Sequence, residues 1–164
     1  TGHDERLTCD EVVSQGYLSK EQWDFVQKAA LALFARGQKS AKEAGLILVD
    51  TKYEFGVDKN NDILLIDEVH TPDSSRYWKL DTYEQRLKEG KEPENFDKEF
   101  VRMAYAAKGY RGDGEIPELD ENVWNEAIQL YITAYEKLTK SKFVPGEYPV
   151  EERIVKNLKK AGLM

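Results

Sequence analysis

The stretch LILVDTKYEFGVDKNNDILLID, residues 46–67, decides the fold of this chain. Its first half is rich in β-branched and aromatic residues, and apolar residues return after the turn-forming run DKNND at residues 58–62. Two such runs joined by a short polar turn predict a β-hairpin. We therefore expect one strand within residues 46–56 and a second within residues 63–67.

Charged residues fall on one face of the first predicted strand. Because side chains alternate between the faces of a strand, Asp50, Lys52 and Glu54 should point the same way. A turn centred between residues 60 and 61 places Glu54 directly across from Asp67. Facing carboxylates repel unless one is protonated or a cation lies between them. A magnesium ion that keeps open positions for water and phosphate fits this pair, and a solvated charged face is the alternative.

The run TPDSS, residues 71–75, follows the hairpin and should interrupt regular structure, and Arg76 comes directly after it. Two hydroxyls and a guanidinium at the end of a strand can hold a carboxylate or a phosphate. On the hairpin itself, Lys52 can hold an anionic substrate group and Asp50 can orient it. The residues thus point to an anion site beside a metal site.

Helical periodicity dominates the remaining sequence. Capping boxes at Thr8 and Ser19 predict two helices, and Gly45 should end the second one. Three more are predicted, with inward apolar faces made of Phe96, Phe100, Met103, Ala104 and Ala107, of Trp124, Ala127, Ile128, Tyr131, Ala134, Tyr135 and Leu138, and of Ile154, Val155, Leu158 and Ala161. The predicted class is α+β, with the β-hairpin as part of a larger antiparallel sheet packed with several helices.

Composition narrows the classes of function. The chain has 164 residues with 24 basic and 31 acidic side chains, a formal net charge of −7. This acidic balance argues against nucleic-acid binding, which needs a basic surface. No apolar run approaches the ~20 residues that span a bilayer, so we expect no membrane segment. The single cysteine, Cys9, excludes an internal disulfide and suits a reducing compartment such as the cytoplasm.

Four blocks of sequence occur in an order known from one family. They are DTKYEFG at residues 50–56, IDEV and TPDSSRYW at residues 66–69 and 71–78, FDKEFVR at residues 96–102, and AYEKLT at residues 134–139. The first block is similar to the Asp-x-Lys-x-Glu-Phe-Gly signature of phosphoribosylaminoimidazole-succinocarboxamide synthase, or SAICAR synthetase, and the others resemble its later blocks. HDE at residues 3–5 is also similar. The resemblance covers about residues 46–140.

The resemblance implies the fold of the large C-terminal domain of that family. It also implies an ATP-dependent ligase that joins L-aspartate to the carboxylate of carboxyaminoimidazole ribotide in de novo purine biosynthesis. ATP and Mg²⁺ would be its cofactors, with Glu54 and Asp67 holding the metal. The resemblance places Lys52 and Asp50 at the reacting carboxylate. The ribotide phosphate and other substrate anions would be held by Ser75, Arg76, Lys98 and Arg102.

Some features depart from the family pattern. His70 stands where we expect an apolar residue, and it is either a packed or surface histidine or a contact of the substrate loop. The chain begins at Thr1, so we expect a C-terminal portion whose residues 1–164 form one substrate- and metal-binding domain. The ATP-clamping N-terminal lobe would then be absent, and the chain alone would have little turnover.

Two other functions remain open from the residues. One is a non-catalytic module that binds a phosphorylated ligand through its cations, and the other is a kinase-like phosphotransferase that uses the same carboxylates. The sequence also leaves the oligomeric state open, a homo-oligomer included.

Overall fold

A computed structural model gives the structure of the chain and describes residues 6–164. The block at residues 3–5 lies outside the described residues. The first two helices, α1 (Cys9–Ser14) and α2 (Lys20–Glu43), confirm the predicted starts, because the side chains of Thr8 and Ser19 form complete capping boxes. Gly45, with φ +74°, follows the end of α2, which confirms it as the terminating glycine.

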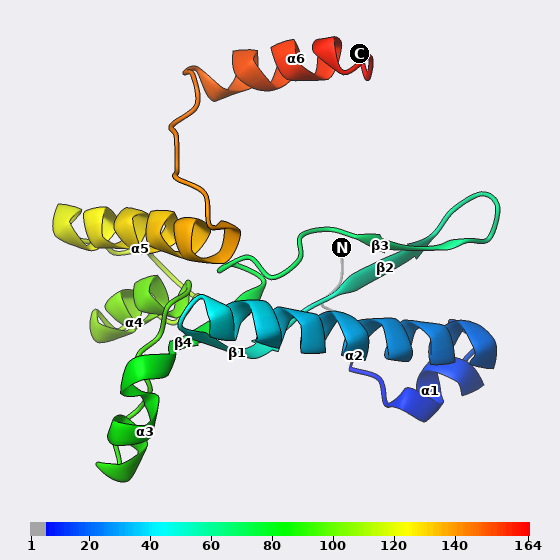
Figure 1. Cartoon of the computed structure of the whole chain (residues 1–164), viewed down its shortest axis with the longest axis horizontal. Helices are drawn as coiled ribbons and strands as arrows, with labels where there is room; N and C mark the ends of the chain where they lie inside the picture. Colours follow the sequence, from blue (N-terminus) through cyan, green and yellow to red (C-terminus); the bar gives the residue numbers. More distant parts are fainter. Residues whose placement is uncertain (1–5) are drawn as a thin grey trace.

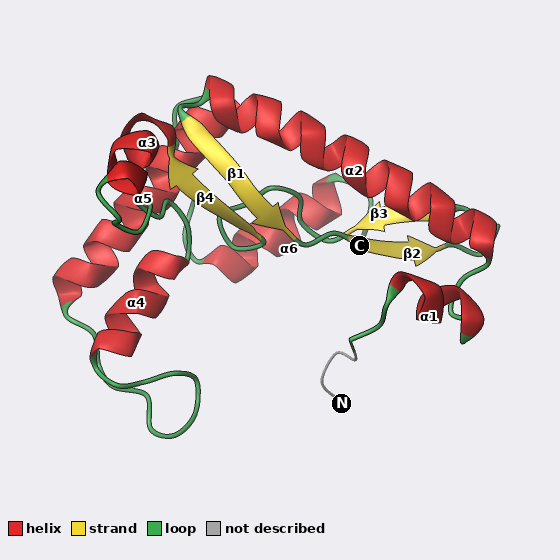
Figure 2. Cartoon of the chain, turned by 90° about the horizontal axis from the view of Figure 1, so that it is seen from below, coloured by secondary structure: helices red, strands yellow, loops and turns green. Residues whose placement is uncertain are grey.

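Two antiparallel strand pairs form the β part of the molecule, and they confirm the predicted α+β class. Strand β1 (Leu46–Thr51) pairs with β4 (Ser75–Lys79), and β2 (Glu54–Val57) pairs with β3 (Ile63–Ile66). Figure 2 shows β1 and β4 side by side near the C-terminal half of α2, with the β2–β3 hairpin toward its other end. The two pairs are separate two-stranded sheets, so the hairpin of β2 and β3 is not joined to a larger sheet.

The predicted hairpin is wrong in extent and in register. Its arms cover only β2 and β3, and Glu54 pairs with Ile66, not with Asp67. The turn explains the difference, because the Asp58 carboxylate accepts hydrogen bonds from the backbone N–H groups of Asn60 and Asp62. The Asp58 N–H also donates to the Asp62 carbonyl, which leaves residues 59–61 as a three-residue loop centred on residue 60. Such a loop moves every predicted partner by one position.

The prediction that residues 71–75 interrupt regular structure is also wrong at its end. Ser75 and Arg76 begin β4, where they pair with Thr51 and Asp50 of β1. A register shift between Leu48 and Asp50 breaks the simple alternation in β1, and β1 ends before Lys52. Asp50, Lys52 and Glu54 therefore do not share the face of one continuous strand.

Four further helices follow the strands: α3 (Leu80–Lys88), α4 (Glu99–Ala107), α5 (Glu121–Thr139) and α6 (Val150–Lys160). Buried apolar side chains from α2, β1, β4, α5 and the segment before α4 form one core, namely Ala41, Leu46, Leu48, Tyr77, Phe96 and Ala134. The ladder of β1 and β4 lies at its centre. Among the described residues, no helix has both the length and the apolar character that crossing a bilayer requires.

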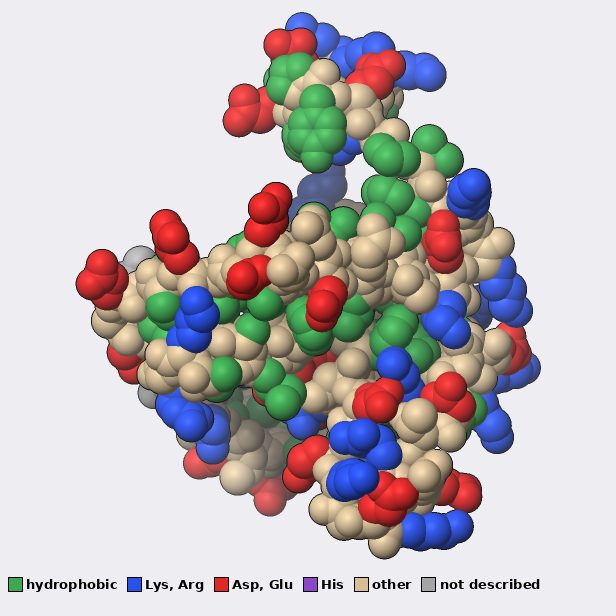
Figure 3. Space-filling view, turned by 90° about the vertical axis from the view of Figure 1, so that its left-hand side faces the viewer, with side chains coloured by type: hydrophobic (Ala, Val, Ile, Leu, Met, Phe, Trp, Pro, Cys, Tyr) green, Lys and Arg blue, Asp and Glu red, His purple; other side chains and the backbone are tan. Residues whose placement is uncertain are grey.

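The predicted inward faces of the last three helices are only partly right. Helix α5 approaches the core through Ala127 and Ala134, and its aromatic neighbours stay at the edge because small residues set the closest approach. The exposed residues of the predicted faces are Met103, Ala107, Trp124, Ile128, Tyr131, Tyr135, Ile154, Val155 and Ala161. An extended segment carries α6 away from the body in Figure 1, and apolar side chains are visible on that part in Figure 3.

One buried carboxylate joins β4 to α4. Asp97 is 2% exposed, and its two oxygens accept hydrogen bonds from the backbone N–H of Tyr77, at 2.6 Å, and of Glu99, at 2.8 Å. Burial raises the pKa of Asp97, and the two backbone hydrogen bonds oppose that rise. The Asp97 carboxylate thus fixes β4 to the start of α4, where Lys98 is the N-cap residue and Arg102 lies in the helix.

We expect Asp97→Asn to destabilise the fold, because one of the two buried N–H groups would face an amide NH₂ instead of an acceptor. The free energy of unfolding should fall by about 1–3 kcal/mol in urea titrations. Asp113→Asn, at an exposed loop position, is the control and should leave the midpoint unchanged. Equal midpoints for both variants would contradict the role of Asp97.

Candidate functional site

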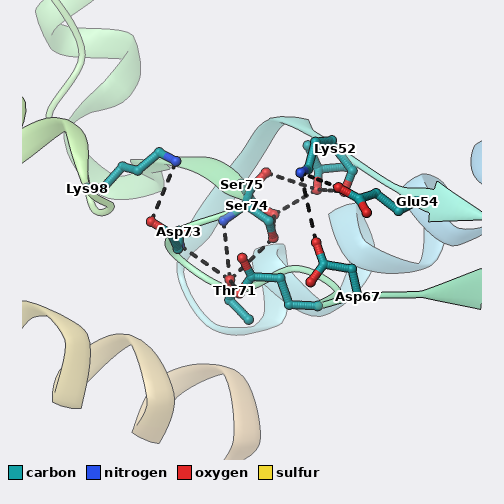
Figure 4. A network of polar contacts seen from close by, with 10 residues as sticks. Lys52, Glu54, Asp67, Thr71, Asp73, Ser74, Ser75 and Lys98 are labelled. Carbon is teal, nitrogen blue, oxygen red and sulfur yellow. Dashed lines mark hydrogen bonds and ion pairs between the residues drawn. The ribbon is translucent and has the colours of Figure 1, made fainter. Parts of the chain in front are cut away.

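Two carboxylates and one ammonium group meet where the two strand pairs join. The Nζ of Lys52 lies 2.5 Å from Oε1 of Glu54 and 3.8 Å from Oδ2 of Asp67. Figure 4 shows the side chains of Glu54 and Asp67 turned toward Lys52. Although the predicted register was wrong, the convergence of the two carboxylates is present.

Backbone geometry at Asp67 explains why the pair survives the change of register. Asp67 is the first residue after β3 and has φ +65°, a left-handed conformation that turns the chain out of the strand. Asp is one of the few residues besides Gly that adopt it readily. The turn brings its carboxylate within reach of the Lys52 ammonium group, which also contacts Glu54 at the start of β2.

A polar cleft of about 280 Å³ lies beside this pair. It is lined by six of the eight predicted site residues, Asp50, Lys52, Ser75, Arg76, Lys98 and Arg102. Asp50 lies at the end of β1 and Lys52 directly after it. Ser75 and Arg76 lie in β4, Lys98 is the N-cap residue of α4, and Arg102 lies within α4. Lys52 belongs both to the cleft and to the carboxylate pair, and so it joins the predicted anion site to the predicted metal site.

Each cation of the cleft has a carboxylate partner. Lys52 pairs with Glu54 as described, and three more ion pairs join Arg76 to Asp50, Lys98 to Asp73 and Arg102 to Glu99, at 3.6, 3.5 and 2.5 Å. Exposed ion pairs of this kind contribute roughly 0–1 kcal/mol each. An incoming phosphate or carboxylate can therefore replace these partners at low cost.

Two serines, Ser74 and Ser75, line the cleft, and hydroxyl groups of neighbouring threonines contact them. The Ser75 hydroxyl is buried and lies 2.8 Å from the Thr51 hydroxyl across the β1–β4 ladder. Thr71 donates a hydrogen bond to Glu68, and it accepts one from the backbone N–H of Ser74. The loop before β4 is thus held in shape by its own polar side chains.

Sequence reasoning missed several residues of this site. Glu68, Asp73, Asp97 and Glu99 also line the cleft, and none of them was proposed as a site residue from the sequence. A signal existed for the loop, because Thr followed by Ser three residues later is typical of a side-chain-closed turn. No comparable signal marks Asp97, whose role depends on a strand 20 residues away.

The acidic pair fits a magnesium ion by its donor chemistry. Glu54 and Asp67 are close enough to share one ammonium group, and their side chains are 44% and 45% exposed. Mg²⁺ is commonly held by one or two carboxylates, with water and phosphate oxygens completing its shell. Among the described residues, no group of three or more acidic, His or Cys side chains could hold a metal. Glu54 and Asp67 are therefore the two ligands that we assign within the described residues.

The arrangement suits an enzyme that handles phosphate groups with a divalent metal, because an acidic pair and an anion cleft share one lysine. Comparisons with known proteins define the family. A sequence model of SAICAR synthetase matches residues 1–117. A phosphoribosylaminoimidazole-succinocarboxamide synthase of Legionella pneumophila is 43% identical over 166 residues, which cover 98% of this chain and 52% of the relative.

Solved structures agree with this assignment. SAICAR synthase from Saccharomyces cerevisiae, complexed with SAICAR, has a TM-score of 0.73 and 34% identity over 87% of this chain and 46% of that one. A type-2 SAICAR synthetase in complex with ADP has a TM-score of 0.61 and 28% identity over 87% and 48%. The chain belongs to the SAICAR synthetase family. It spans about half the length of the curated relatives it matches.

The ion pair between Lys98 and Asp73 gives two predictions of opposite sign. Lys98→Ala should weaken the binding of inorganic phosphate to the chain, because it removes a cation of the cleft. Asp73→Asn should strengthen this binding up to ~5-fold, because the phosphate no longer competes with a carboxylate for Lys98. Titrations followed by isothermal calorimetry would measure both constants.

The matched control for these variants is Lys88→Ala, at an exposed position of α3 outside the cleft. It should leave phosphate affinity unchanged. The account of the cleft fails if Asp73→Asn and Lys98→Ala shift the affinity in the same direction.

Proposed function

We propose that this chain supplies the substrate- and metal-binding part of an ATP-dependent ligase that joins L-aspartate to the carboxylate of carboxyaminoimidazole ribotide. The observation that carries the proposal is the double position of Lys52, which lines the anion cleft and contacts both carboxylates of the acidic pair. Family membership supports it, as do the SAICAR and ADP complexes of two structural neighbours. A cytoplasmic location stays part of the proposal.

The proposed reaction has two steps. An oxygen of the ribotide carboxylate attacks the γ-phosphorus of ATP, which releases ADP and leaves an acyl phosphate. The amine of aspartate then attacks the acyl carbon, phosphate leaves, and the nitrogen loses a proton as the amide forms. Such chemistry needs positioning and charge neutralisation more than covalent help from the protein.

The residues of the site divide this work. Arg76, Lys98 and Arg102 would bind the ribotide phosphate and other substrate anions, with the Ser75 hydroxyl beneath them. Lys52 would neutralise the reacting carboxylate, and Asp50, which pairs with Arg76, would orient that group. Glu54 and Asp67 would hold Mg²⁺, which neutralises charge on the ATP phosphates when it is bound.

The chain spans about half the length of its relatives, so the test uses a protein that also contains the other half. The part of the Legionella pneumophila relative that this chain does not match is joined to the chain, and we call the product of this fusion the completed protein. Formation of the amide is measured with the ribotide, L-aspartate and ATP. We expect amide product that requires all three. ADP release without aspartate would favour a phosphotransferase, and phosphate binding without any turnover would favour a non-catalytic module. Either result contradicts the proposed ligase, provided that the intact relative is active in the same assay.

In the completed protein, Glu54→Gln and Asp67→Asn should each lower kcat/KM by at least about 100-fold, because loss of a metal ligand removes several kcal/mol of charge stabilisation. Glu84→Gln, at an exposed position of α3, is the control and should keep full activity. Activity that survives both ligand substitutions would contradict the metal assignment.

A further inference from the structure

Tyr53 links two segments of the site, namely the one that carries Lys52 and Glu54 and the loop before β4. Tyr53 lies between Lys52 and Glu54, where β1 ends and β2 begins. Its hydroxyl is 2.6 Å from Nε2 of His70, and the two rings meet edge-on with centroids 5.6 Å apart. His70 belongs to the loop that runs from Asp67 to Thr71. The hydrogen bond between these two side chains therefore connects the segment that carries Lys52 and Glu54 to the loop that leads into β4.

The backbone of His70 is fixed from the core side. Its φ is +58°, a left-handed conformation that non-glycine residues adopt infrequently. Its carbonyl oxygen accepts a hydrogen bond from the hydroxyl of Tyr77, at 2.7 Å, and Tyr77 is almost completely buried in β4. Burial raises the pKa of Tyr77 to about 12, so this hydroxyl stays a donor.

The imidazole ring packs directly against the backbone of α2. A Cβ atom placed on Gly37 would lie 2.5 Å from Cε1 of His70 and 2.7 Å from Cδ2 of Leu48, closer than real contacts allow. Glycine at this position leaves room for the ring. The helix therefore fixes the ring from one side, while Tyr53 holds its edge.

The surroundings of His70 are suited to an uncharged hydrogen bond. The pocket that contains His70 has mostly aromatic and apolar walls that include Tyr77, Tyr131 and Tyr135, with some hydroxyl groups, and no carboxylate of the described residues lines it. Burial lowers the pKa of His70, and burial also raises the pKa of Tyr53. A neutral imidazole and a protonated phenol form this bond in either imidazole tautomer. The apolar residue expected at position 70 would leave the Tyr53 hydroxyl without this partner.

We propose that His70 is a positioning residue of the site: through Tyr53 it holds Lys52 and Glu54 at a fixed place relative to the loop of residues 67–74. The roles of Lys52 and Glu54 in this statement rest on the proposed function, whereas the mechanical link does not. Two backbone hydrogen bonds report on the link, because the Lys52 N–H donates to the Ser74 carbonyl and the Ser75 N–H donates to the Thr71 carbonyl.

Amide hydrogen exchange on the 164-residue chain tests the link without substrate. His70→Leu and Tyr53→Phe should each accelerate exchange at Lys52 and Ser75 about tenfold, as expected for loss of one hydrogen bond. The double variant should be no faster than either single one. His70→Gln, whose amide can meet the Tyr53 hydroxyl, should restore slow exchange.

The amide of Leu80, which donates to the Gly45 carbonyl at the other end of the β1–β4 ladder, is the internal control. Unchanged exchange at Lys52 and Ser75 would overturn the proposal, and so would equal acceleration at Leu80. Tyr53→Phe removes one oxygen only, so it decides the question if His70→Leu does not fold.

The kinetic constants of Tyr53→Phe and of the unchanged completed protein then test whether the link affects the reaction. In the completed protein, Tyr53→Phe should lower kcat about tenfold with the KM for the ribotide within about twofold, because the phosphate-binding cations are untouched. A larger effect on KM than on kcat would contradict a role at Lys52 and Glu54. An inactive completed protein would count against the ligase and leave the exchange result intact.

Discussion

The pairing of β1 with β4 is the constraint on which the rest of the structure depends. It joins residues 46–51 to residues 75–79 and buries Leu46, Leu48 and Tyr77 beside α2 and α5. The same register places Asp50 beside Arg76 and Thr51 beside Ser75. The 23 residues between the two strands must leave the ladder and return to it. These residues form the β2–β3 hairpin and the loop after it. Residues at both ends of this segment contribute to the site.

The charges of the site are balanced before any ligand arrives. Four cations reach the cleft from the segment between β1 and β2, from β4 and from the start of α4, and each has a carboxylate partner within 4 Å. Solvated pairs hold long side chains in place yet are weak enough to exchange for a phosphate. Buried groups provide the rigidity instead, since Asp97 fixes α4 to β4 and the His70 carbonyl is tied to Tyr77. The buried hydrogen bonds thus fix the backbone of the site, while the exposed carboxylate partners of its cations can be replaced by a ligand.

Local features of this fold could be predicted from the sequence, whereas features set by distant contacts could not. The capping boxes at Thr8 and Ser19 depend on four adjacent residues, and both were predicted correctly. Strand β4 was missed because its partner is β1, far back in the sequence, and because Pro and Ser precede it. The Asp58 side chain set a loop of three residues, so the predicted register was one residue off. The apolar pattern of α5 predicted an inward face, but the small alanines on that face decide which part of it is buried.

In the candidate site, alternation and turn chemistry indicated Asp50, Lys52, Glu54 and Asp67, and only family resemblance indicated Lys98 and Arg102. His70 and Asp97 act through tertiary contacts, which have no local signature.

The central claim is that Glu54 and Asp67 form one divalent-cation position next to the anion cleft. Paramagnetic broadening tests it directly on the described chain, since Mn²⁺ takes carboxylate ligands as Mg²⁺ does and broadens the amide signals of nearby residues. Substoichiometric Mn²⁺ should broaden the amides of Glu54, Asp67 and Glu68 first and leave those of α3 and α6 sharp. Broadening that begins instead at the acidic residues before and in the first turn of α5, while Glu54 and Asp67 stay sharp, would contradict the account.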